Sequence, residues 1–98
     1  MHTVSGRSLI GIGYGNFLAV NKIVAVITPD SAPVKRMVQE AREDGSLIDA
    51  TCGRRTRAVV VTDSGHTVLS ALTADTVAGR MNGKENLSAS DENATERT

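Results

Sequence analysis

The chain has 98 residues, 40% of them hydrophobic and only 2% aromatic, so we expect one small domain with an aliphatic core. Its formal net charge is zero, which excludes a global basic field that would attract polyanions. Residues 1–80 carry nine Lys or Arg against seven Asp or Glu, whereas residues 81–98 carry two against four. Any binding of nucleic acid therefore needs a local basic cluster, or many copies of one in an assembly.

The cysteine and hydropathy content is typical of a soluble protein from a reducing compartment. Cys52 is the only cysteine, so no disulfide can form within the chain. The sequence contains neither a secretion signal nor a long apolar span. We therefore expect a cytoplasmic protein without membrane contact.

The N-terminal part predicts a flexible arm followed by short strands. Residues 1–8 are polar and form the arm, and strands are expected over 8–12 and 17–20, joined by a glycine-rich turn. Ile23–Ile27 is apolar on both faces and predicts a third strand, either buried or at an interface.

The next segment carries the signals of a helix over residues 32–44. Asp30 or Ser31 can cap its free N–H groups, Pro33 suits its first turn, and Gly45 can end it. One apolar stripe runs along this helix at the expected spacing: Val34, Met37, Val38 and Ala41.

The C-terminal half predicts a hairpin, a second helix and a tail. Strands over 57–62 and 66–71 flank a tight turn, and Thr73 can cap a helix over 74–81. Residues 83–98 are acidic and almost free of apolar side chains, which predicts disorder. The fold class is therefore α+β, a small antiparallel or mixed sheet with two helices, formed by residues 9–82.

The most distinctive stretch is Gly53-Arg54-Arg55-Thr56-Arg57, which leads directly into an apolar strand. A strand holds what precedes it, so we expect the three arginines at the rim of a rigid sheet. Planar, permanently charged guanidinium groups suit phosphate oxygens and guanine edges, which favours an arginine loop presented to nucleic acid. The alternative is that these arginines only solvate a turn and pair with nearby acids.

Other candidate sites are weaker. The stretch Gly11–Asn16 lacks the spacing of a phosphate-binding loop, and His2 and His66 are isolated, so neither a nucleotide nor a zinc site is predicted. A catalytic pair of Cys52 and His66 would rest on a weak signal. We therefore expect no enzyme, no cofactor and no metal. Lys22 would join the arginine patch only if the sheet brings their turns together.

Three segments resemble the RemA family of bacterial extracellular matrix regulatory proteins. They are the helix start Ser31-Ala32-Pro33-Val34-Lys35-Arg36-Met37, the run Leu47-Ile48-Asp49-Ala50-Thr51, and Gly53-Arg54-Arg55-Thr56-Arg57-Ala58-Val59-Val60. The similarity covers about residues 9–81 and leaves out both ends. It implies a LytTR-like protomer in a ring-shaped, octamer-like homo-oligomer whose subunit number stays open. It also implies a nucleoid-associated DNA-binding activator of biofilm-matrix and osmoprotection genes.

The resemblance also implies the DNA-contacting residues. The adjacent pair of the family's glycine-led loop matches Arg54 and Arg55, and a basic residue of an earlier turn matches Lys22. The family carries arginine at that earlier position, and lysine keeps the charge but lacks the planar fork. Arg57 is expected in a supporting role. The expected partners are double-stranded DNA and further copies of the chain, with no small-molecule substrate.

A second interpretation comes from a different class of protein. The chain would be a non-enzymatic structural or protein-interaction module whose arginines form salt bridges between subunits. Arg57 could then pair with Asp49 or Asp63.

Overall fold

A computed structural model describes residues 8–83 of the chain. The elements follow in the order β1 Leu9–Gly13, β2 Asn16–Ala19, the short 3-10 helix η2 Val20–Lys22, β3 Ile23–Ile27, α1 Ala32–Asp44, β4 Leu47–Asp49, β5 Ala58–Thr62, β6 Thr67–Ser70 and α2 Ala74–Met81. The predicted α+β class with two helices is confirmed. Apart from residues 8 and 83, the predicted N-terminal arm and acidic tail lie outside the described residues.

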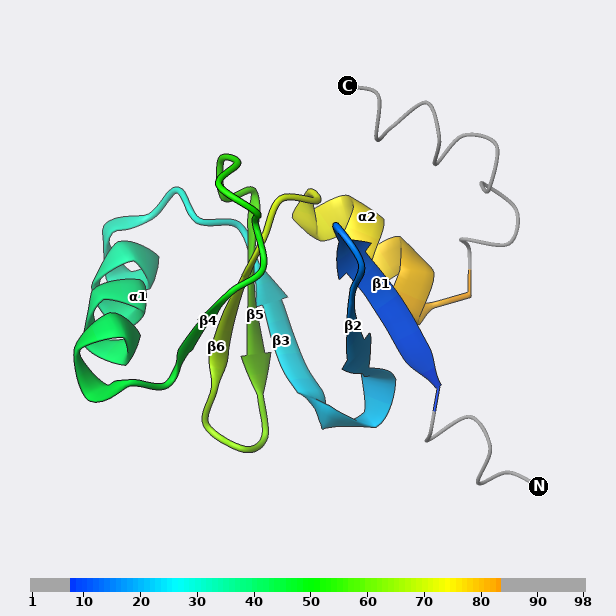
Figure 1. Ribbon diagram of the computed structural model, residues 1–98, viewed down its shortest axis with the longest axis horizontal. Helices are drawn as coiled ribbons and strands as arrows, with labels where there is room; N and C mark the ends of the chain where they lie inside the picture. The colour runs from blue at the N-terminus through cyan, green and yellow to red at the C-terminus, as the bar shows by residue number, and fades with distance from the viewer. Residues whose placement is uncertain (1–7, 84–98) are drawn as a thin grey trace.

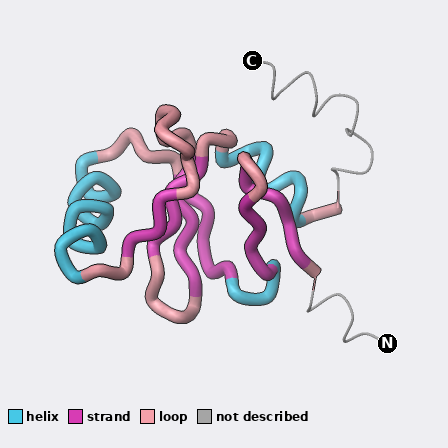
Figure 2. Tube along the Cα trace, in the orientation of Figure 1, coloured by secondary structure: helices cyan, strands magenta, loops and turns pink. Residues whose placement is uncertain are grey.

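The strands form two sheets (Figures 1 and 2). β1 and β2 pair antiparallel in a two-stranded sheet, and the other four strands have the order β3-β5-β6-β4. β5 lies antiparallel to both β3 and β6, whereas β4 runs parallel to β6, so the larger sheet is mixed. In Figure 1, α1 lies beside β4 at one end of the molecule, and α2 lies with β1 and β2 at the other.

Both helices begin and end where the sequence predicts. Ser31 caps α1 by accepting a hydrogen bond from the N–H of Val34 (3.3 Å). Gly45 ends α1 in the left-handed region, with φ of 84°. Thr73 caps α2 in the same way, accepting from the N–H of Thr76 (3.2 Å).

The core is aliphatic and centres on β5 and β6. Val60 and Val68 are fully buried, and they pack with side chains from β1 and α2. The buried members of this cluster are Ile10, Ile12, Ala50, Val60, Val68, Leu72 and Val77. Val59 and Leu69, paired on the opposite face of the same two strands, are buried as well. The central hairpin is therefore covered on both sides, so it is a rigid support for the loops at its ends.

One strand is less covered than its composition suggests. β3 lies at the edge of the larger sheet, and Val24 is 65% exposed where the pairing with β5 is irregular. The sequence predicts that this strand is either buried or at an interface. Complete burial is wrong within one protomer.

Candidate nucleic-acid interface

The arginine loop, residues 50–57, connects β4 to β5 through a tight turn. The N–H of Arg54 donates to the carbonyl of Thr51 (3.0 Å), and Cys52 and Gly53 between them have φ of 56° and 80°. Two consecutive residues with positive φ are the mark of a type I′ turn. Glycine adopts this conformation without strain, which explains Gly53 at the start of the basic run.

Both ends of the arginine loop are hydrogen-bonded to β6. The N–H of Ala50 donates to the carbonyl of Leu69 (2.9 Å), and the N–H of Arg57 donates to the carbonyl of Ser70 (2.8 Å). Because these two acceptors are consecutive residues of one buried strand, the base of the loop is closed and fixed.

Asp49 stabilises the entry to the loop. Its Oδ1 accepts hydrogen bonds from the hydroxyl (2.6 Å) and the backbone N–H (2.9 Å) of Thr51. These two bonds, the hydroxyl first, hold the pKa of the Asp49 carboxyl below its ordinary value of 3.8. The carboxylate is therefore engaged in shaping the loop.

The guanidinium groups at the tip of the loop are exposed. Arg54 and Arg55 are solvent-accessible, and within the described residues neither forms an ion pair with a carboxylate. The guanidinium carbon of Arg54 lies 5.7 Å from the centre of the Tyr14 ring, within the range of a cation–π contact. The loop therefore presents two donor-rich cations to solvent.

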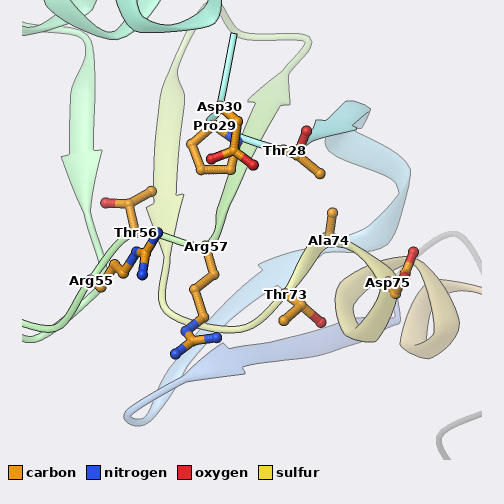
Figure 3. A pocket seen from close by; sticks show the side chains of 9 residues that line it. All are labelled: Thr28, Pro29, Asp30, Arg55, Thr56, Arg57, Thr73, Ala74 and Asp75. Carbon is orange, nitrogen blue, oxygen red and sulfur yellow. The ribbon is translucent and has the colours of Figure 1, made fainter.

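Arg57 lies at the base of the loop, directly before β5. Its exposed side chain extends toward Thr73 in a cleft of about 270 Å³, which Arg55 also lines (Figure 3). Asp30 and Asp75 contribute carboxylates to the same cleft, so its charge is mixed rather than purely basic. In the described part of the chain Arg57 pairs with neither Asp49 nor Asp63.

Lys22 is not part of the arginine cluster in one protomer. Its carbonyl accepts a hydrogen bond from the N–H of Asp63 (2.8 Å), just past the end of β5, whereas Arg57 lies just before the start of that strand. Six residues of extended chain span roughly 20 Å. Lys22 and the arginine loop therefore lie at opposite ends of the sheet (Figure 1).

The sequence did not indicate Tyr14 as part of the site. It occupies the tip of the β1–β2 hairpin, with φ of 58°, between two glycines that also have positive φ. Asn16 Nδ2 donates to the carbonyl of Ala50 (3.4 Å), which joins this hairpin to the base of the arginine loop. A contact between residues so distant in sequence leaves no local signal.

The weaker candidate residues Cys52 and His66 lie in different loops. Cys52 is exposed in the arginine loop, whereas His66 lies before β6, where its Nδ1 is 2.8 Å from the hydroxyl of Ser64. Across residues 8–83, no group of three or more potential metal-binding side chains comes together. None of the helices in this range is long and apolar enough to cross a membrane.

Fold and loop together define a small α+β domain that carries an exposed arginine pair on a fixed loop. A sequence model of the family described as RemA-like, extracellular matrix regulatory protein A-like, matches residues 9–81. The chain belongs to this family.

Curated relatives agree with this assignment. A protein of Alkaliphilus oremlandii is 62% identical over 81 residues, covering 83% of this chain and 87% of its own length. A protein of Acetivibrio thermocellus is 60% identical over 77 residues (79% and 83%), and one of Heliobacterium modesticaldum is 57% identical over 88 residues (90% and 96%). Each bears the name "Putative regulatory protein". The family and these names support a regulatory role.

Proposed function

We propose that this protein is a non-enzymatic, DNA-binding transcriptional regulator that works as a ring-shaped homo-oligomer. Arg54 and Arg55 contact the DNA backbone, and Arg57 and Lys22 have supporting roles. The protein acts in the cytoplasm on the nucleoid, where it activates extracellular-matrix and osmoprotection genes, as the family resemblance implies.

The observation that carries this proposal is the exposed Arg54–Arg55 pair on a loop closed by two hydrogen bonds to β6. Charge-assisted contacts to phosphate favour groups that are oriented before binding and that are not already held in an ion pair. One neutral protomer is a weak ligand for a polyanion, but repetition of the same loop around a ring makes a basic belt. Each additional phosphate neutralised adds affinity and steepens the salt dependence.

Assembly is supported by the outer face of the β1–β2 hairpin. Leu9 and Phe17 are each 62% exposed, and strand pairing places them on one face, with Ala19 opposite Leu9 and Gly11 opposite Phe17. Large apolar side chains gathered on one surface of a small protein are typical of interaction sites. We assign this face to contact with a second copy of the chain.

The test is binding to a long DNA duplex across a salt series. We expect the wild type to bind with an affinity that falls as salt rises, and the double variant Arg54→Ala/Arg55→Ala to lose most of it. The slope of log affinity against log salt should become shallower by roughly 1 to 2 for each protomer engaged, since each phosphate contact contributes about 0.9.

The matched control removes two arginines from helix α1 instead. Arg36 and Arg42 are exposed there, so Arg36→Ala/Arg42→Ala changes the net charge equally and should leave the salt slope unchanged. Oligomer size is measured for every variant. If the wild type shows no salt-dependent binding, the proposal fails. If the loop variant falls apart into monomers, its arginines are interface residues and the protein is the structural module instead.

A further inference from the structure

The tip of the β1–β2 hairpin, residues 13–15, projects beside the arginine loop. A Cβ placed on Gly15 would meet no heavy atom within 4 Å, so this glycine is required by its φ of 80° and not by crowding. Tyr14 is 53% exposed although its ring lies over Arg54. The tip carries no acidic side chain, so nothing in it would repel a phosphate.

This tip is held in place from behind. The buried hydroxyl of Ser70 donates to the carbonyl of Ile12 (2.8 Å), and Arg80 Nη1 donates to the carbonyl of Gly11 (2.9 Å). The backbone carbonyl of Ser70 also accepts a hydrogen bond from the N–H of Arg57. The hairpin and the arginine loop are therefore fixed to the same residue of β6, and their relative position is set by the core.

We propose that the hairpin tip is a second DNA-contacting element, in which Tyr14 orients Arg54 and forms the adjoining part of the DNA-facing surface. This inference rests on the proposed function. A guanidinium held over an aromatic ring loses less freedom when it binds phosphate, because part of its rotamer entropy is already lost. The phenol group itself is a common donor to phosphate and sugar oxygens.

Substitutions of Tyr14, alone and combined with those of the arginines, test the role of the ring. A cation–π contact at an exposed site corresponds to roughly a two- to fivefold change in affinity, so Tyr14→Ala should weaken binding to the duplex by about that factor per engaged protomer. Tyr14→Phe retains the ring and should stay closer to the wild type than Tyr14→Ala. Adding Tyr14→Ala to Arg54→Ala should have a smaller effect than adding it to Arg55→Ala, because only Arg54 contacts the ring.

Fluorescence gives an independent readout. Tyr14 is the only tyrosine and the chain has no tryptophan, so its emission reports on the hairpin tip alone. We expect duplex DNA to change this emission at low salt and high salt to restore it. If Tyr14 had only a structural role, Tyr14→Ala would change the melting temperature, but DNA would leave the tyrosine emission of the wild type unchanged.

The outcomes separate the inference from the proposed function. If Tyr14→Ala binds DNA like the wild type while Arg54→Ala/Arg55→Ala does not bind, the inference is wrong and the proposed function stands. Equal effects of Tyr14→Ala in the Arg54→Ala and Arg55→Ala backgrounds would also overturn it. If the wild type itself does not bind the duplex, the proposed function fails and the inference fails with it.

Discussion

Replacing Ser70 by alanine should destabilise the protein through the loss of two buried hydrogen bonds. The Ser70 side chain is fully buried, and its hydroxyl donates to the carbonyl of Ile12 (2.8 Å) and accepts from the N–H of Leu72 (3.0 Å). A buried polar group that loses its partner costs about 1–3 kcal/mol, so we expect a loss of about 2 kcal/mol. For a domain of this size, that lowers the melting temperature by roughly 8–16 °C.

Thermal unfolding followed by circular dichroism measures this effect. All variants are compared at one protein concentration, because assembly makes the melting temperature depend on concentration. Ser8→Ala is the control, since the Ser8 side chain is exposed just before β1 and makes no hydrogen bond within the described residues, so it should change stability by less than about 0.5 kcal/mol. A Ser70→Ala protein that melts within 2 °C or so of the wild type would refute the reasoning.

Phe17→Glu places a charge on the outer face of the β1–β2 hairpin and should reduce the assembly to smaller species by light scattering; unchanged size would show that this face is not an interface. Cys52→Asn suits the first position of the type I′ turn and should raise stability by about 0.5–1 kcal/mol in denaturant titrations, whereas a loss would argue against strain at that φ. The hydrogen bonds from Thr51 lower the pKa of Asp49, so the stability from this group is present above its ordinary pKa and is lost as pH falls below about 4. The urea midpoints of the wild type and Asp49→Asn should therefore converge at low pH, and a difference that stays constant would contradict this assignment.

Local signals were sufficient for the helices and for most of the strands. Ser31 with Gly45 marks both ends of α1, and Ile23–Ile27 matches β3 residue for residue. Cap and turn residues act within a few positions, so their effect can be predicted from neighbouring sequence alone. The predicted β5–β6 hairpin is confirmed, with its strands slightly shorter than expected.

Long-range pairings could not be predicted in the same way. The parallel pairing of β4 with β6 joins residues about twenty apart, and β4 has only three residues. The separation of Lys22 from Arg54 depends on which end of β5 each one approaches, and the antiparallel pairing of β3 with β5 decides that. Tyr14 has no local signal for the same reason, because its turn connects two strands and only the fold places it beside the arginine loop.

The closure of the arginine loop on two consecutive residues of β6 has a consequence for how such proteins diversify. Because the base of the loop is fixed by backbone hydrogen bonds to Leu69 and Ser70, side chains at its tip contribute little to folding. Substitutions at the tip can therefore accumulate without loss of the sheet beneath. Under the proposed function, a lineage can change what the loop contacts while it inherits an unaltered scaffold, and an engineer can vary the same few positions to redirect binding.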